Sequence, residues 1–176
     1  MKSDFKISKD EKELLAIKYK YVNEALFFYT IDYNDEFFFG VEEFDFRLDG
    51  YQIRLNEDIT DMEIITNYSS EINKMEGLVN EIIDFKIDLT NFKTIFTDLM
   101  KMDIVISIER EYYDEDYFFL IGKIVDVLDD SLVFKDFDIN GEFSDDLNYV
   151  PYELITTIRF NSKYTNTWQK YLKNNV

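Results

Sequence analysis

Histidine and cysteine are both absent from this chain of 176 residues. Without cysteine there is no disulfide and no thiolate metal site, and without histidine the commonest metal ligand is missing. The usual base that activates a serine or cysteine nucleophile is missing as well. The sequence also lacks a phosphate-binding loop and a GxGxxG fingerprint. We therefore expect a protein that is not an enzyme and that holds no cofactor.

Proline occurs once, glycine five times, and the longest apolar stretches have only the length of a strand. The first fifteen residues contain no apolar segment of the kind found in signal peptides. We expect a cytoplasmic protein that does not cross a membrane. Apolar residues nevertheless make up 46% of the chain and aromatic residues 18%, which is too much for a disordered acidic tail and indicates a globular fold.

Basic residues are in short supply, because 19 Lys and Arg stand against 37 Asp and Glu, for a net charge of -18. Such a charge repels phosphate groups, so nucleic acids and anionic membranes are disfavoured partners. The charge is uneven. Residues 98–153 contain 16 acidic and 4 basic residues, whereas residues 154–176 contain four basic residues and no acid. The partner of the acidic stretch is expected to be a basic protein.

Two segments of the chain are repeated at low identity. Residues 29–39 align with residues 123–133 at an offset of 94, and residues 51–63 align with 147–159 at an offset of 96. Apolar positions and turn acids coincide along both blocks, and the two extra residues fall in a loop opposite residues 44–48. We interpret the pattern as a tandem duplication, with two similar hairpins in one sheet as the alternative.

Alternating apolar and polar residues predict five short strands in each copy, separated by acidic or Asn-containing turns. In the first copy we place a loop at Leu48–Gly50. Five twisted antiparallel strands with one buried face close best into a small barrel, since closure hides the edge strands. The predicted fold is therefore mainly β, with two tandem five-stranded antiparallel barrels in residues 1–86 and 87–176.

Helical periodicity brackets the strands. Ser8 and Glu11 have the spacing of a capping box and predict a short helix before the first strand. Apolar residues spaced three and four apart predict a second helix from Tyr68 to about Asp84. Two further helices are predicted at residues 90–100 and 164–172, so that each barrel is flanked by helices.

The alignment also predicts a matched core. The inward positions of the first copy and their counterparts in the second are Ile31 and Val125, Phe38 and Leu132, Ile53 and Tyr149, and Ile59 and Ile155. Most of the aromatic residues lie in strand runs and are assigned to the core as well, among them Phe27, Phe37, Phe39, Phe118 and Phe119.

This order of elements resembles the Sm-like (SH3-like) small barrel, in particular that of uncharacterised bacterial Sm-like proteins. The residues that carry the resemblance are Gly122, Ile124, Asp126, Leu132, Ile155 and Ile158, whereas the first copy has Phe28 in place of the glycine. The resemblance implies RNA binding. The ring-forming RNA chaperones of this class surround the nucleotide with His, Lys and Arg, and neither copy supplies such a set in its loops. Fold analogy alone does not carry function.

Residues 136–141 read D-x-D-x-N-G, the first half of an EF-hand calcium loop. Asp136, Asp138 and Asn140 are the candidate ligands. The second half departs from the motif, since Leu147 stands where a bidentate Glu is required. A solvated turn between strands explains the same residues, and we expect no resident metal.

The acidic stretch is the candidate partner site. Exposed tyrosines with carboxylates around them suit a basic, partly apolar protein surface. The residues assigned to it are Tyr112, Tyr113, Asp114, Glu115, Asp116, Asp129, Asp130, Asp145 and Asp146. The leading hypothesis is a non-catalytic acidic protein that masks a basic surface of a partner, like an immunity protein or an anti-defence inhibitor. The alternative is an RNA-associated regulator that uses the basic C-terminal helix, with Arg159, Lys163, Lys170 and Lys173 as contacts.

Overall fold

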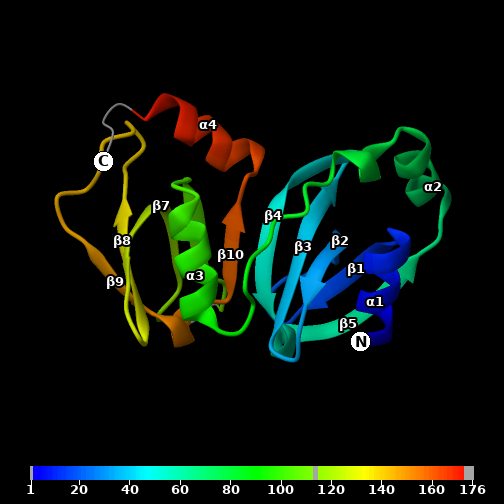
Figure 1. Cartoon of the computed structure of the whole chain (residues 1–176), viewed down its shortest axis with the longest axis horizontal. Coiled ribbons are helices and arrows are strands. Elements are labelled where there is room, and N and C mark those ends of the chain that lie inside the picture. The colour runs from blue at the N-terminus through cyan, green and yellow to red at the C-terminus, as the bar shows by residue number, and fades with distance from the viewer. Residues whose placement is uncertain (1, 113–114, 173–176) are drawn as a thin grey trace. The chain divides into compact units, whose positions relative to one another are not determined.

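The computed structural model describes residues 2–112 and 115–172 and divides the chain into two compact units, Met1–Phe85 and Lys86–Val176 (Figure 1). In these residues the fold is mainly β, with ten antiparallel strands and four α-helices. None of the helices in the described segments is both long enough and apolar enough to span a bilayer.

The N-terminal unit begins with a helix and continues as an antiparallel sheet. Its elements are α1 (Lys2–Glu11), β1 (Leu14–Tyr19), β2 (Leu26–Tyr33), β3 (Phe37–Phe44), β4 (Arg47–Leu55), η1 (Asn56–Asp58), β5 (Ile59–Ile65), α2 (Tyr68–Met75) and η2 (Leu78–Glu81). The strands lie in the order β5-β1-β2-β3-β4.

The C-terminal unit has the same sequence of elements through its last strand. They are α3 (Phe92–Lys101), β6 (Ile106–Arg110), β7 (Phe118–Val127), β8 (Ser131–Asp136), β9 (Asn148–Pro151), η3 (Tyr152–Leu154), β10 (Thr157–Phe160) and α4 (Lys163–Tyr171). The strand order β10-β6-β7-β8-β9 matches that of the N-terminal unit position by position.

Strand register carries the same offsets as the sequence alignment. The ladder between β2 and β3 has a bulge at Thr30–Asp32, and the ladder between β7 and β8 has one at Ile124–Asp126, 94 residues later. Phe38 pairs with Arg54, as Leu132 pairs with Val150. Within the described residues the five strands of neither unit close into a barrel, because no ladder joins β4 to β5 or β9 to β10. The closed barrels of the prediction are not observed.

The first helix begins earlier than the capping-box pattern predicts. Ser8 lies inside α1 rather than at its start, and it is fully buried. Its hydroxyl accepts hydrogen bonds from the backbone N–H of Thr30 (3.1 Å) and from the Thr30 hydroxyl (2.9 Å). The ring of Phe5 stacks on Phe38 with centroids 5.1 Å apart. The serine therefore anchors the helix to β2 instead of capping it.

The predicted helix from Tyr68 to Asp84 is wrong in its second half. The helix α2 ends at Met75, and Gly77 follows with a φ of 77°. A left-handed residue of this kind terminates a helix. The chain then forms η2 and an irregular segment, in which the Ile83 N–H donates to the phenol oxygen of Tyr51 at 2.7 Å. The predicted loop at Leu48–Gly50 is also wrong, since these residues belong to β4.

The matched core is confirmed only in part. Phe38, Ile53, Leu132 and Ile155 are buried, and so is Ile31. Val125 and Tyr149, however, are 41% and 66% exposed, and Ile59 is half-buried. For Ile31 and Val125, the segments that follow the last strand of each unit differ. Val79 and Ile82, in and just after η2, line the same hollow as Ile31, whereas Trp168 of α4 packs against a different group, Val105, Ile121 and Phe137.

A chain of polar side chains is buried in the N-terminal unit. The Gln52 amide donates to the carboxylate of Glu42 at 2.5 Å, and Arg54 Nε donates to the Gln52 amide oxygen at 2.6 Å. Arg54 is only 1% exposed, and its guanidinium carbon lies 4.6 Å from the Tyr19 ring centroid. The C-terminal unit repeats the acid–amide pair, since Asn148 donates to Asp136 at 3.1 Å.

Gly122 is required by the close approach of β7 to β8. A Cβ at this position would overlap the carbonyl oxygen of Lys135 and lie 2.8 Å from the Cα of Asp136. Gly122→Ala is therefore expected to destabilise the C-terminal unit by about 3 kcal/mol, at the upper end of the range for overpacking. Urea denaturation followed by circular dichroism measures this. Val125→Ala, on the exposed face of the same strand, is the control, and equal losses in the two variants would contradict the explanation.

Candidate functional site

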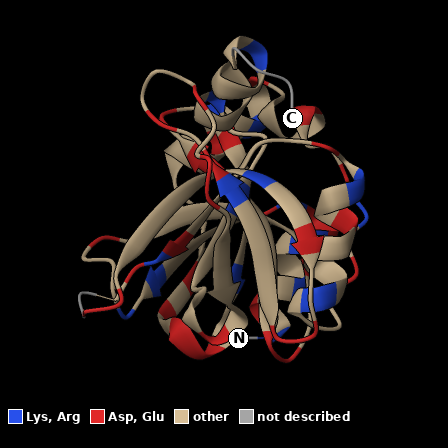
Figure 2. Ribbon diagram, turned by 90° about the vertical axis from the view of Figure 1, so that its left-hand side faces the viewer, with Lys and Arg blue, Asp and Glu red and all other residues tan. Residues whose placement is uncertain are grey.

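The acidic turns proposed as the partner site lie at two different ends of the C-terminal sheet. Glu115 and Asp116 precede β7, and Asp129 and Asp130 follow it. Consecutive turns of an antiparallel sheet alternate between its ends, so the ten residues of β7 separate these two pairs. Asp145 and Asp146 precede β9 and therefore lie at the same end as Glu115 and Asp116. All six carboxylates are exposed, and Figure 2 shows acidic residues at several turns and strand ends.

Asp129 and Asp130 are tied to local structure. Lys93 donates to Asp129 at 2.5 Å, and this hydrogen bond and the lysine charge hold the pKa of Asp129 below its usual value. Nearby, burial raises the pKa of Tyr152 to about 12, with the charges of Asp130 and Asp129 acting in the same direction. The Tyr152 phenol thus stays protonated at neutral pH and donates to the Leu128 carbonyl at 2.8 Å.

The tyrosine part of the predicted site is described only at Tyr112. That side chain is half-buried, and the Arg110 guanidinium carbon lies 5.1 Å from its ring centroid. Tyr113 and Asp114 lie outside the described residues. The partner-binding role of this end of the sheet stays a prediction.

The D-x-D-x-N-G segment forms a turn that uses its own carboxylates. Asp138 Oδ1 accepts the backbone N–H groups of Asn140 (2.9 Å) and Glu142 (3.0 Å), and its Oδ2 accepts the Asn140 side-chain amide at 2.8 Å. The Asp136 carboxylate accepts a hydrogen bond from the Asn148 side-chain amide. The described residues contain no group of three or more acidic side chains arranged to hold a metal ion.

The basic residues of the alternative site lie on two elements. Lys163 and Lys170 are exposed on α4, and the Lys170 ammonium lies 5.1 Å from the Tyr171 ring centroid. Arg159 belongs to β10 and is half-buried. Lys173 lies outside the described residues.

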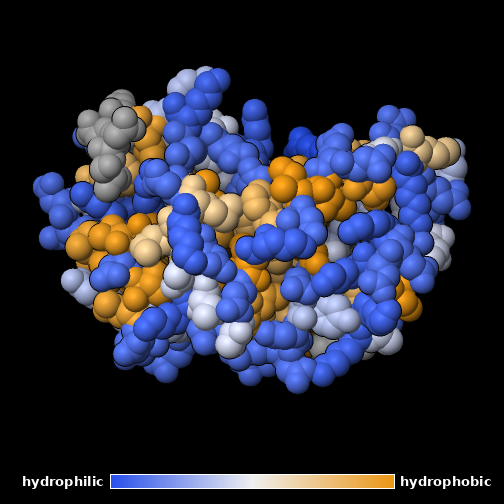
Figure 3. All heavy atoms as spheres, viewed as in Figure 1, coloured by the Kyte–Doolittle hydropathy of each residue, from blue (hydrophilic) through white to orange (hydrophobic). Residues whose placement is uncertain are grey.

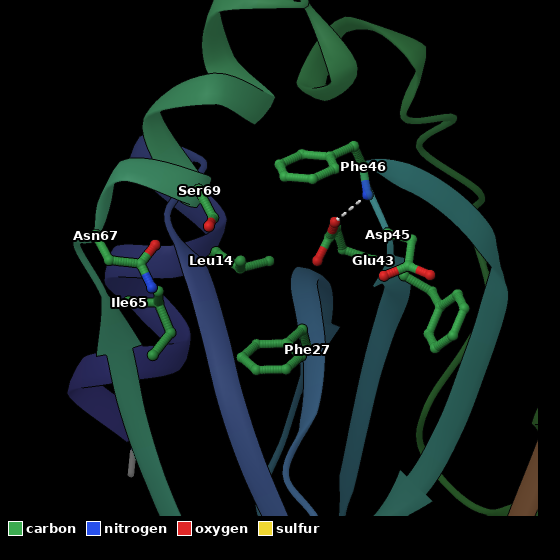
Figure 4. A pocket seen from close by; sticks show the side chains of 9 residues that line it. Leu14, Phe27, Glu43, Asp45, Phe46, Ile65, Asn67 and Ser69 are labelled. Carbon is green, nitrogen blue, oxygen red and sulfur yellow. Dashed lines mark hydrogen bonds between the residues drawn. The ribbon is translucent and has the colours of Figure 1, made fainter.

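A hollow of about 320 Å³ opens at one end of the N-terminal sheet (Figure 4). It is built from the ends of four strands, β1, β2, β3 and β5, from the turn between β3 and β4, and from the start of α2. The lining residues are Leu14, Phe27, Glu43, Phe44, Asp45, Phe46, Ile65, Asn67 and Ser69. Figure 4 shows Leu14, Ile65 and Phe27 around the hollow and Phe46 over its upper side.

Apolar rings and carboxylates meet at this hollow. Leu14 is buried at its base, Phe27 is 38% exposed, and Phe44 and Phe46 are about half exposed. Asp45 is exposed and Glu43 is half-buried, so both carboxylates border the rings. None of the residues that line the hollow has a basic side chain. Apolar area with a negative border is the complement of a side chain that combines a hydrocarbon stem with a positive end.

The turn that carries Phe46 is strained. Asp45 and Phe46 have φ values of 50° and 63°, as a two-residue type I′ hairpin requires. Asn and Gly adopt this conformation readily, whereas a phenylalanine does so at a cost of order 1 kcal/mol. The Glu43 carboxylate accepts the Phe46 N–H at 2.8 Å and holds the turn. Despite this cost, the hairpin places an aromatic ring at the mouth of the hollow.

The start of α2 forms the other wall. Asn67 caps the helix, and its side-chain oxygen accepts the Ser70 N–H at 3.0 Å. The hollow therefore lies between a capped helix and a hydrogen-bonded turn, both fixed locally.

Two of the phenylalanines assigned to the core from the sequence are in fact exposed. Phe27 lines the hollow, and Phe119 is 42% exposed in the C-terminal unit. Each has an adjacent phenylalanine in its strand, Phe28 or Phe118. Successive residues of a strand point to opposite faces of the sheet. If only one face packs into a core, one phenylalanine of each pair must therefore lie on the other face. That alternation was the available signal. On the face viewed in Figure 3, apolar surface patches interrupt a hydrophilic surface.

No family model, curated protein or solved structure matches this chain. The chemistry of the hollow and the charge of the chain are therefore the basis for a functional conclusion.

Proposed function

We propose that this protein is a non-catalytic, acidic binding protein that covers a basic, partly apolar surface of another protein. The observation that carries the proposal is the hollow of the N-terminal unit, where three partly exposed phenylalanines are bordered by Glu43 and Asp45. Exposed aromatic side chains at the centre of a patch supply most of the binding energy of protein interfaces. The concrete form that we favour is an antagonist of a basic nuclease-like or defence protein.

The charge of the chain supports the same partner class. A net charge of -18 attracts basic proteins over distances beyond direct contact and speeds their association at low salt. The exposed carboxylates of the C-terminal turns add to this field. These carboxylates act through long-range attraction, which salt screens. The hollow supplies desolvated contact area, which salt does not screen, so measurements at several salt concentrations separate the two contributions.

The resemblance to Sm-like barrels is part of the proposal at the level of fold. The strand order, the preceding helix and the short 3-10 helix before the last strand recur in both units and support it. Its RNA-binding implication is the competing outcome, because Lys163 and Lys170 are exposed on α4.

The test uses fluorescent peptides as partner surrogates. A peptide of alternating Lys and Leu is expected to bind, and its affinity should fall as salt rises. A Lys–Ser peptide of equal charge tests the apolar contribution, and a Glu–Leu peptide tests the charge. Equal binding of all three would contradict the proposal. If single-stranded RNA binds tightly at physiological salt, and the double variant Lys163→Glu with Lys170→Glu abolishes that binding, the RNA-associated regulator would replace the proposed function.

A double variant in the strained hairpin separates binding at the hollow from stability of the fold. Asp45→Asn with Phe46→Gly supplies the residues that a type I′ turn favours, so the free energy of unfolding should stay equal or rise by about 1 kcal/mol. Binding of the Lys–Leu peptide should weaken at least about tenfold, because a ring and a carboxylate are lost. Tyr149→Ser, which removes an exposed ring from the C-terminal unit, should leave binding unchanged. A variant that is stabilised but binds normally would exclude the hollow as the site.

A further inference from the structure

A second hollow, of about 440 Å³, lies entirely within the C-terminal unit. It is bordered by β7, by the loop after β8 and by α4. Its lining residues are Phe119, Leu120, Ile121, Asp136, Phe137, Asp138, Ile139, Tyr164 and Trp168. The lining combines four aromatic rings with two carboxylates and contains no basic side chain.

The rings form corners rather than a flat surface. Tyr164 and Trp168 meet at 87° with centroids 6.4 Å apart, and Phe119 is tilted by 47° to Tyr164 at the same separation. Phe119 and Tyr164 remain 42% and 51% exposed. A cation within about 6 Å of a ring centroid is attracted by the negative face of the ring. Several rings at angles can therefore act on one cation together.

Packing against buried residues holds the Trp168 side chain in place. It packs against the buried group of Val105, Ile121 and Phe137, and its centroid lies 4.9 Å from that of Phe137. Gly141 has a φ of 74°, and a Cβ there would lie 3.4 Å from the indole ring. The helix that carries the tryptophan is fixed as well, because Gln169 accepts the Val105 N–H at 2.7 Å. The indole is thus positioned before any ligand arrives.

The two carboxylates contribute charge, but the one in the loop is already engaged. Asp138 accepts three hydrogen bonds from its own loop, whereas Asp136 accepts one from Asn148. A primary ammonium has three N–H groups that need acceptors, whereas a methylated ammonium with no N–H needs none. A neutral apolar ligand would gain nothing from the two negative charges, and an anion would be repelled.

From these features we infer that the C-terminal hollow is a binding site for a fully methylated alkylammonium group. The cation lies against Phe119, Tyr164 and Trp168, and Asp136 and Asp138 supply the negative field. A free quaternary amine and a trimethylated lysine side chain share this chemistry. The site is separate from the hollow of the N-terminal unit and has a different ligand class.

Trp168 is the single tryptophan of the chain, so its fluorescence reports on this site directly. Choline and N-acetyl-trimethyllysine amide are titrated into the whole protein as the two probes. Either is expected to give a saturable change, and the comparison identifies the source of the ammonium. The neutral isostere of choline, 3,3-dimethylbutanol, and the primary amine ethanolamine should each bind at least about tenfold more weakly.

A variant that removes one ring tests the geometry. Phe119→Leu keeps an apolar side chain at an exposed position and should weaken choline binding about three- to thirtyfold, the contribution expected of one cation–π contact. Phe27→Leu, the same change in the N-terminal hollow, should leave choline binding unchanged. Phe27→Leu should weaken binding of the Lys–Leu peptide. The two variants therefore distinguish a failure of the proposed function at the N-terminal hollow from a failure of the inference at the C-terminal hollow.

Three results would overturn the inference. They are equal affinity for 3,3-dimethylbutanol and choline, equal affinity for ethanolamine and choline, and the absence of a saturable signal with either probe in both tryptophan fluorescence and the indole N–H resonance. The first result would show that the hollow recognises only apolar shape, and the second would show that it recognises only positive charge.

Discussion

Replacing Arg54 by alanine is expected to lower the free energy of unfolding of the N-terminal unit by about 3 to 5 kcal/mol, the cost of breaking a buried ion-containing network at one member. The guanidinium is buried, hydrogen-bonded to Gln52 and placed against the Tyr19 ring. Its removal leaves the Gln52 amide oxygen without this donor and takes the positive charge out of the buried chain of polar groups that includes Glu42. Chemical denaturation followed by circular dichroism measures the effect.

A paired replacement is the control for this prediction. Arg54→Met with Glu42→Gln removes both charges and restores most of the volume, so it should destabilise less than Arg54→Ala alone. The C-terminal unit supports this expectation, because the buried Val150 stands at the position equivalent to Arg54. A loss below about 1 kcal/mol in Arg54→Ala would show that the network contributes little to stability.

Truncation of the matched core residues should be nearly as costly. Phe38→Ala is expected to destabilise by about 3 to 5 kcal/mol and Leu132→Ala by about 2 to 5 kcal/mol, because both side chains are fully buried and leave cavities. The Phe38 ring also loses its contacts with Phe5 and Phe28, whose centroids lie 5.1 and 5.3 Å away. Thermal and urea unfolding measure both variants.

Tyr149→Ala is the matched control for these truncations. Its predecessor in the alignment, Ile53, is buried, but Tyr149 is mostly exposed and should cost less than about 0.5 kcal/mol. A large loss at Tyr149, or a small one at Leu132, would mean that equivalent positions do not have the burial described here.

The repeated register was accessible from the sequence because strands have a period of two. Ile31 and Asp32 align with Val125 and Asp126 as an apolar position followed by an acid, and the bulges fall at the same places. Burial was less accessible. Whether Val125 is covered depends on where the segment after the last strand packs, and neither alternation nor propensity contains that information.

The candidate sites were harder to predict for two physical reasons. Glu115–Asp116 and Asp129–Asp130 are close in sequence, yet the ten residues of β7 lie between them, so proximity along the chain does not by itself place these carboxylates together. The Asp45–Phe46 turn carries no glycine or asparagine, and its left-handed conformation had no local signal. Both hollows depend on side chains from elements distant in sequence.

The closeness of β7 to β8 at Gly122 has a consequence for how the chain avoids misassembly. Two units of equal strand order can exchange strands while they fold, a characteristic failure of tandem repeats. If β2 took the place of β7, Phe28 would meet the Lys135 carbonyl where only a glycine fits. The reverse exchange would put Gly122 in place of Phe28 and leave a void beside Phe38. Divergence at this one pair of positions disfavours both hybrid sheets.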